Sequence, residues 1–223
     1  MTGMTMGLEG SCFWIIGAGR FGTRAIRRLR GKRPDVRITV VDRDLNALQA
    51  VEGAGVTPVR DEGASYLTVH MEGADSPDWI IPAAPVHLAF EWVRLKLGAG
   101  ALRKMPVPVE IEKRLPNPIR GSKGQLYVSY ADFVCPDNCV EPFDRCTFTG
   151  KPRKGLLYRD LEYLFYDNFT PIVVRSHQLA PGVGGYRPEA LRQSLARVRA
   201  AHGPILFSTA CLCHGVVHAF EIV

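Results

Sequence analysis

Apolar positions in the first hundred residues follow two alternating patterns. Short runs of consecutive apolar residues are typical of buried strands, and apolar residues that recur every three or four positions are typical of amphipathic helices. Strands are expected at residues 12–16, 37–41, 56–59 and 79–81. Helices are expected after the first and second of these strands, and at residues 87–97. The alternation predicts an α/β fold with a Rossmann-like, doubly wound parallel sheet.

The pattern changes after Gly98, where four prolines within residues 105–118 indicate an extended connection. Further strands are expected at residues 126–130, 172–175 and 205–207, with a loop at 135–152 and a helix at 188–201. We therefore expect a Rossmann-like dinucleotide-binding unit over residues 1–100 and a cysteine-containing C-terminal extension over residues 101–223. The βαβ unit that ends this extension is compatible with a continuation of the first sheet.

A glycine-rich motif, Gly17-x-Gly19-x-x-Gly22, ends the first strand and opens the first helix, and Asp42 ends the second strand. The glycines allow a tight turn, close approach of a pyrophosphate and close helix–strand packing, while the acid can accept hydrogen bonds from ribose hydroxyls. The expected cofactor-binding residues are Gly17, Ala18, Gly19, Arg20, Phe21, Gly22, Asp42 and Arg43.

NAD(H) is the favoured dinucleotide, because the carboxylate of Asp42 would repel the 2′-phosphate of NADP. Arg43 keeps NADP open as an alternative, since its guanidinium could pair with that phosphate. A second alternative is a degenerate Rossmann unit that keeps its glycines only for packing.

Two blocks of the chain resemble the N-terminal NAD-binding domain of TrkA-type potassium-uptake regulators, the RCK-N domain. They are Phe13-Trp14-Ile15-Ile16 with the glycine motif that follows it, and Val40-Val41-Asp42-Arg43-Asp44. The resemblance covers about residues 11–97 and implies that Gly17, Gly19, Gly22 and Asp42 contact a nucleotide. It departs after the third strand, where the family usually has Gly-Asp-Ala and this chain has Arg60-Asp61-Glu62-Gly63-Ala64. The resemblance thus implies nucleotide binding more than a role in potassium transport.

Five of the six cysteines lie in two clusters, the second of which adjoins His214. Soft metals and iron–sulfur clusters take about four thiolate or imidazole ligands on turn-rich segments. The candidate ligands for zinc or an iron–sulfur cluster are Cys135, Cys139, Cys146, Cys211 and Cys213.

Two other interpretations of the cysteines stay open. Cys211 and Cys213 could share one face of a final strand as core residues. The second interpretation is a catalytic thiol, but Cys213 and His214 as nucleophile and base would point to opposite faces of a strand. Cys12, within the first strand, is expected in the core.

Charge and hydropathy limit the partners. The net charge of +6 owes much to seven basic residues in and after the first helix, which predict a solvated face or a phosphate-attracting surface. Nucleic acid is disfavoured because Phe21 is the only aromatic residue among them. Residues 1–9 do not resemble a signal peptide, and no apolar stretch reaches the ~20 residues that span a bilayer. We expect a cytoplasmic protein with reduced thiols, a dinucleotide partner and no membrane contact, and leave a homodimer open.

His87 and His177 follow expected strands and are candidates for acid–base chemistry. The alternative is that they are surface histidines without a catalytic role. The sequence leaves open whether the protein is an enzyme. Its leading interpretation is an NAD(H)-binding protein, either a small oxidoreductase or a redox or energy sensor, with a metal or iron–sulfur site. The alternatives are a non-catalytic regulatory module of the RCK type and a metal-stabilised structural protein.

Overall fold

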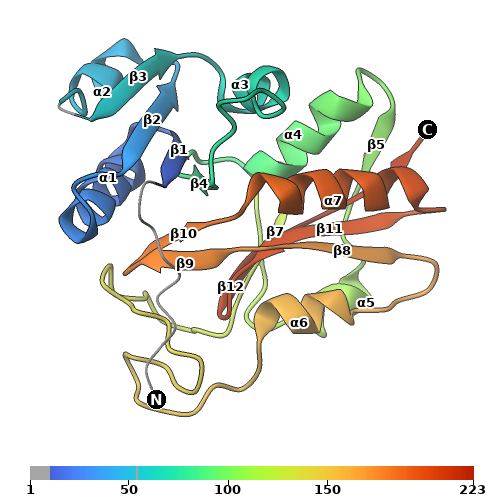
Figure 1. The fold of residues 1–223 in the computed structure, drawn as a ribbon. Coiled ribbons are helices and arrows are strands. Elements are labelled where there is room, and N and C mark those ends of the chain that lie inside the picture. Colours follow the sequence, from blue (N-terminus) through green and yellow to red (C-terminus); the bar gives the residue numbers. More distant parts are fainter. Residues whose placement is uncertain (1–10, 54) are drawn as a thin grey trace.

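The computed structural model describes residues 11–53 and 55–223, which form two large sheets and a separate two-stranded hairpin, with helices packed between and around the large sheets (Figure 1). Residues 1–9, in which no signal peptide is expected, lie outside the described residues. Among the described helices, none combines the length and apolar character that crossing a bilayer requires.

The first sheet is parallel, with strand order β3-β2-β1-β4. Its strands are β1 (Cys12–Ile16), β2 (Arg37–Asp42), β3 (Val56–Arg60) and β4 (Trp79–Pro82). Its helices are α1 (Arg20–Lys32), α2 (Leu45–Gln49), α3 (Gly63–His70) and α4 (Leu88–Leu97). This arrangement confirms the predicted Rossmann-like fold. Helix α3 was not expected, and it starts where the Glu62 carboxylate accepts a hydrogen bond from the backbone N–H of Ser65 (2.8 Å).

The second sheet has the order β6-β7-β12-β11-β8, and β5 also pairs with β12. Its strands are β5 (Leu102–Met105), β6 (Ile119–Arg120), β7 (Leu126–Ser129), β8 (Thr170–Arg175), β11 (Ile205–Ala210) and β12 (His214–Ile222). Helices α5 (Val109–Glu112) and α6 (Leu157–Glu162) cover one face, and α7 (Pro188–Ala200) covers the other (Figure 1).

The final βαβ unit therefore lies outside the first sheet, because β8 and β11 pair with each other and β11 turns directly into β12. The short hairpin of β9 (His177–Ala180) and β10 (Val183–Gly185) packs against the first sheet. Just after this hairpin, Ile80 of β4 and Tyr186 exchange two backbone hydrogen bonds of 2.9 and 3.0 Å.

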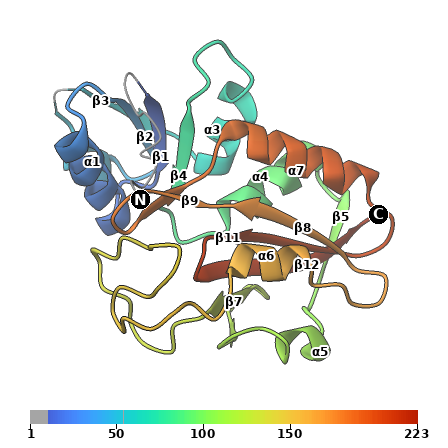
Figure 2. The ribbon, with the colours of Figure 1, turned by 60° about the horizontal axis from the view of Figure 1, so that its bottom comes forward.

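One apolar core joins the two sheets. Trp14, Ile16 and Ile80 of the first sheet belong to the same buried cluster as Phe207 and Phe220 of the second. Side chains of α3, α4 and α7 fill the space between them. The two halves of the chain are thus packed as one body, as the view from the second direction also shows (Figure 2).

A pair of histidines lies at this junction. His87, at the start of α4, and His218 of β12 approach each other through their Nδ1 atoms at 2.9 Å. The Nε2 atom of His87 lies 2.9 Å from the hydroxyl of Thr209, and Phe90 stacks on the His218 ring. One Nδ1 must donate and the other accept, so the two rings cannot both be doubly protonated. Burial lowers the pKa of both rings, that of His218 to about 4.

We expect this pair to make stability depend on pH. A histidine whose pKa is lower in the folded than in the unfolded chain contributes stability above about pH 6.5, and that contribution is lost as the pH falls toward 4. From pH 7 to pH 5, His218 should cost the native protein ~2 kcal/mol of unfolding free energy. Urea unfolding of the native protein and of His218→Gln at both values measures the difference.

The control is His202→Gln, at an exposed position before β11, which should keep the native pH dependence. An equally steep loss of stability in His218→Gln would contradict this role of the histidine pair.

Candidate functional site

The fold requires glycine at two of the three positions of the motif. Gly17 has a φ of +114°, and a Cβ there would lie 2.7 Å from the carbonyl carbon of Ala83. A Cβ on Gly22 would lie 1.9 Å from the carbonyl oxygen of Gly17, so α1 approaches the loop too closely for any side chain. A Cβ on Gly19 would meet nothing within 4 Å. The structure itself therefore does not require glycine at position 19, whereas a pyrophosphate at this place would.

The start of α1 beside this opening has backbone N–H groups that no side chain of the described residues caps. Gly19 caps the helix without a side-chain hydrogen bond, and the first turn contains no acidic residue. The N–H groups and the positive end of the helix dipole can therefore bind an anion. Arg20 and Phe21, the next two residues of the motif, have exposed side chains.

Asp42 holds the glycine loop in place. Its carboxylate accepts hydrogen bonds from the backbone N–H of Ala18 (2.7 Å) and from that of Asp44 (3.0 Å). A carboxylate has about four acceptor positions, so two stay available to ribose hydroxyls. Arg43 beside it is exposed at the end of β2.

The basic face of α1 is bound to other parts of the protein, which neither sequence interpretation foresaw. Arg24 is buried and pairs with the carboxylate of Asp137. Arg28 donates to the backbone carbonyls of Asp137 and Pro181, and Lys32 donates to that of Leu179 (3.1 Å). The helix face is therefore largely an internal contact surface, because carbonyls and a carboxylate from the second half of the chain need these donors.

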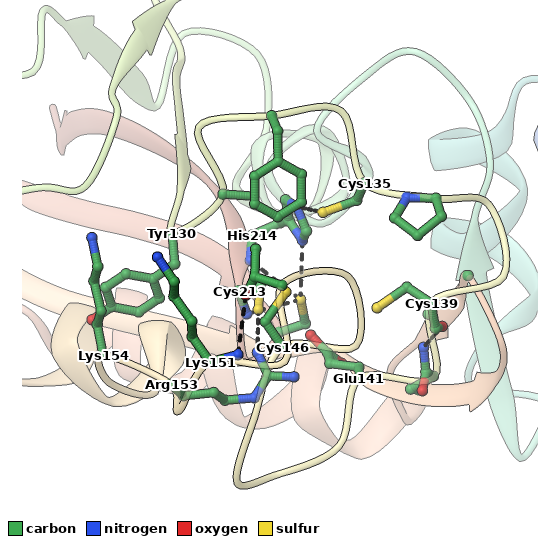
Figure 3. Close-up of a pocket in the computed structure, with 18 of the residues that line it drawn as sticks. Tyr130, Cys135, Cys139, Glu141, Cys146, Lys151, Arg153, Lys154, Cys213 and His214 are labelled. Atoms are coloured by element: carbon green, nitrogen blue, oxygen red, sulfur yellow. Dashed lines mark hydrogen bonds between the residues drawn. The ribbon is translucent and has the colours of Figure 1, made fainter.

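The two cysteine clusters meet in space. Cys135, Cys139, Cys146, Cys211 and Cys213 all line one cavity of about 410 Å³, together with His214 and Glu141 (Figure 3). The loop of residues 131–156 forms one wall, and the turn between β11 and β12 forms another. Lys151 and Lys154 lie at one side of the cavity next to Tyr130 (Figure 3).

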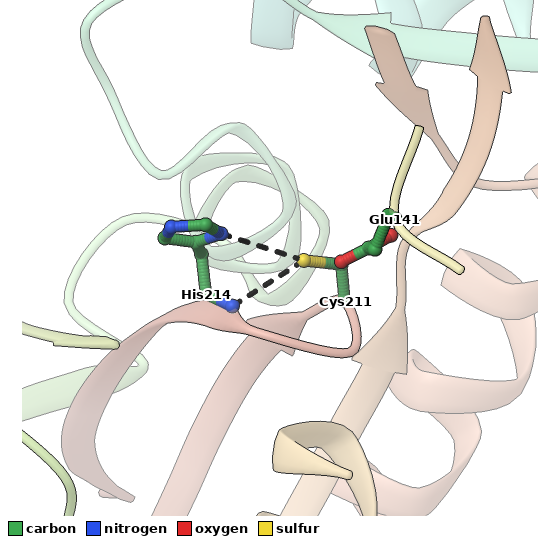
Figure 4. Close-up of side chains that lie close together, drawn as sticks. All are labelled: Glu141, Cys211 and His214. Atoms are coloured by element: carbon green, nitrogen blue, oxygen red, sulfur yellow. Dashed lines mark hydrogen bonds between the residues drawn. The ribbon is translucent and has the colours of Figure 1, made fainter. Parts of the chain in front are cut away.

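Within this cavity, three side chains come close enough to share one ion. Ligand atoms of Glu141, Cys211 and His214 all lie within 4.8 Å of one another (Figure 4). The sulfur of Cys211 lies 3.9 Å from Nδ1 of His214. It also accepts hydrogen bonds from the backbone N–H groups of Cys213 (3.4 Å) and His214 (3.3 Å), which favour a thiolate, but burial and the nearby Glu141 carboxylate outweigh them and raise the pKa of this thiol.

The expectation that Cys211 and Cys213 share one face of a strand is wrong. Strand β11 ends at Ala210 and β12 begins at His214, so both cysteines lie in the turn between them. The backbone N–H of Cys211 donates to the carbonyl of His214 and closes this turn. The side chains of Cys211 and Cys213 therefore need not point to the same face, as they would two positions apart on a strand.

The other thiols have different neighbours. The sulfur of Cys135 lies 3.4 Å from Nε2 of His214, while that of Cys139 lies 3.2 Å from the hydroxyl of Thr147. Cys213 accepts a hydrogen bond from the guanidinium of Arg153. Cys12 is separate from all of them, partly buried in β1.

Burial raises the pKa of three cavity thiols, Cys135, Cys211 and Cys213, whereas the pKa of Cys146 is lowered. Burial raises the pKa of Cys213 to about 11 despite the nearby Arg153, so this thiol is protonated at neutral pH and is a poor nucleophile. The backbone N–H and hydroxyl of Thr149 lower the pKa of Cys146. His214 faces Cys135 and Cys211, so Cys213 and His214 do not form a nucleophile–base pair.

Sequence reasoning missed Glu141. It contacts the turn directly, because its carboxylate accepts a hydrogen bond from the backbone N–H of Leu212 (3.1 Å). Its φ of +44° is unusual for a residue other than glycine, and such strain is common at functional sites. The available signal was an acidic residue two positions after Cys139, in a loop already assigned to metal binding.

Neither candidate acid–base histidine faces the glycine loop. His177 packs against Trp79 at the start of β4, with ring centroids 5.7 Å apart, whereas the glycine loop packs against Ala83 at the other end of this strand. Both ring nitrogens of His87 are engaged by His218 and Thr209.

Comparison with known proteins finds separate matches for the N-terminal and C-terminal residues of the chain. Residues 13–89 match the TrkA-N domain, which confirms the resemblance to RCK-N domains and supports a nucleotide-binding regulatory module. A protein of Archaeoglobus fulgidus, described as an uncharacterized protein, is 29% identical over 224 residues, which cover 93% of this chain and 98% of the relative. Residues 89–223 match a family model described as "Uncharacterized protein, C-terminal domain". Since that model covers more than half of the chain, the protein belongs to the family that this C-terminal domain defines.

Proposed function

We propose that this protein is an NAD(H)-binding regulatory protein that senses redox or energy state and holds a metal ion in its thiol-lined cavity. One observation carries the proposal. Asp137, between Cys135 and Cys139 of the cavity, is bound by arginines of α1, the helix that opens at the glycine loop. The two sites are therefore neighbours, although more than a hundred residues separate them in the chain.

The glycine loop supports a dinucleotide. The open space beside Gly19, the donors at the start of α1 and the remaining acceptor positions of Asp42 suit a pyrophosphate and its ribose. NAD(H) is preferred to NADP(H), because the carboxylate of Asp42 would repel a 2′-phosphate.

The donor set of the cavity fits zinc better than an iron–sulfur cluster. Glu141, Cys211 and His214 offer one oxygen, one sulfur and one nitrogen, a mixture that zinc accepts, whereas clusters are held mainly by thiolates. Zinc is usually four-coordinate, and Cys135, which lies against the other ring nitrogen of His214, would have to move to become the fourth ligand. When bound, the ion would supply charge that keeps the buried thiol of Cys211 deprotonated. A reducing compartment such as the cytoplasm would keep these thiols available.

A sensor is preferred to a small oxidoreductase for a geometric reason. Hydride transfer requires acid–base groups beside the nicotinamide. His177 lies at the opposite end of β4 from the glycine loop, and the nitrogens of His87 are already engaged. A regulatory protein needs only that bound nucleotide and bound metal favour particular conformations.

Substitution of Gly19 tests the nucleotide site. Since a Cβ at this position meets no protein atom, Gly19→Val should fold normally and lose affinity for NADH only by blocking the pyrophosphate. We expect the Kd for NADH to rise at least about tenfold in a fluorescence titration. Gly31→Val is the matched control, because position 31 is equally open and lies at the far end of α1. Unchanged NADH binding in Gly19→Val would refute the site.

The identity of the dinucleotide is tested separately. The native protein should bind NADH more tightly than NADPH, because only NADPH places a 2′-phosphate next to Asp42. Asp42→Ala should weaken NADH binding by ~1–3 kcal/mol, the scale of a hydrogen bond to a charged group. Isothermal titration with both nucleotides measures this, and equal affinities of the native protein for the two would rule out the ribose role of Asp42.

Metal analysis tests the cavity. We expect zinc in protein purified without oxygen, and its loss from Cys211→Ser, because serine does not replace a thiolate for a soft ion. Cys12→Ser is the matched control and should keep the metal, since Cys12 lies in β1 outside the cavity. Cys139→Ser tells two sets of ligands apart. It should keep the metal if Glu141, Cys211 and His214 bind the ion, and lose the metal if Cys139 is one of the ligands. Absence of both zinc and iron from the native protein would overturn the metal proposal.

A further inference from the structure

Asp137 is bound by three arginines on successive turns of α1. Its carboxylate pairs with Arg24 and, at 3.3 Å, with Arg20, and its backbone carbonyl accepts from Arg28. The loop that carries Cys135 and Cys139 is thereby held against the helix that begins at the glycine motif.

The two arginines that share this carboxylate differ in freedom of movement. The side chain of Arg24 is 9% exposed, whereas that of Arg20 is 78% exposed. Arg24 is therefore fixed by its surroundings, because a buried guanidinium needs its counter-charge. Arg20 is the first residue of α1, and its long side chain can turn from Asp137 toward an anion at the helix start.

We infer that a bound dinucleotide and Asp137 compete for Arg20, so that nucleotide binding loosens the cysteine loop at Cys135. The inference rests on the proposed nucleotide site. A pyrophosphate at the start of α1 attracts Arg20 and repels the Asp137 carboxylate, and both effects weaken the same contact. By linkage, a loop held firmly against α1 must weaken nucleotide binding by the same factor.

The loosening should be local. Gln178 donates to the backbone carbonyl of Cys139 (2.7 Å), and the backbone N–H of Gly182 donates to the same oxygen (3.0 Å). These contacts come from the β9–β10 hairpin and do not involve Arg20, so Cys139 should stay in place. Cys135 has no such backbone anchor among the described residues, and its sulfur contacts His214.

Site-resolved thiol labelling with iodoacetamide, read by peptide mass spectrometry, tests the inference with NADH as the probe. In metal-free native protein, saturating NADH should raise the labelling rate of Cys135 about two- to fivefold, the range that loss of an exposed ion pair allows, and leave that of Cys139 unchanged. In Asp137→Asn, Cys135 should react fast with iodoacetamide with or without NADH. This variant should bind NADH about two- to fivefold more tightly than the native protein does.

Two further variants complete the design. Arg20→Gln removes only the exposed partner, so it should fold if Asp137→Asn does not, and NADH should no longer change the labelling of Cys135. Asp144→Asn is the matched control, because Asp144 is an exposed acid of the same loop that pairs with its neighbour Arg145. It should respond to NADH as the native protein does.

The outcomes separate the inference from the proposed function. If NADH binds but neither the labelling of Cys135 nor the affinity of Asp137→Asn changes, the coupling is overturned and the nucleotide site stands. If NADH does not bind at all, both are overturned. Because the readout is thiol labelling, the coupling is tested whether or not the cavity binds a metal.

Discussion

The structure depends on one buried charge. The guanidinium of Arg24 is removed from water on α1 and requires a counter-charge, since an unpaired buried cation costs several kcal/mol or more. The chain supplies Asp137, 113 residues away, so the cysteine loop must lie on this helix. The glycine motif begins the same helix. The requirement to satisfy one arginine therefore places a thiol-lined cavity beside a nucleotide-type site.

Features that depend on neighbouring residues could be predicted from the sequence. Strand β1, helix α1 and the glycine motif were predicted because strand burial, helix periodicity and turn geometry are all local. The contacts of the basic face of α1 could not be predicted, since an amphipathic pattern shows which side of a helix is polar but not what that side contacts. Here Arg28 and Lys32 donate to carbonyls contributed by residues 137 and 179–181, which only the folded chain brings near.

The candidate metal site shows the same limit at the level of single atoms. Residue chemistry was enough to group the five cysteines, and the fold brings all of them to one cavity. Which of them are neighbours depends on the turn at Cys211 and Cys213, whose backbone hydrogen bonds no spacing rule specifies. Glu141 enters the group through a left-handed backbone conformation, which the sequence does not signal in a residue other than glycine.

The shared core decides how a signal could travel between the two sites. Buried side chains of both sheets form one cluster, and close-packed cores resist continuous deformation, so a hinge between the sheets would have to break that packing. Residues 131–156 contain no helix or strand and are held at the surface by polar contacts such as the one between Arg20 and Asp137. Those contacts cost far less to exchange than apolar packing does. The proposed communication between nucleotide and cavity would therefore run through the loop, with the sheets as its fixed support.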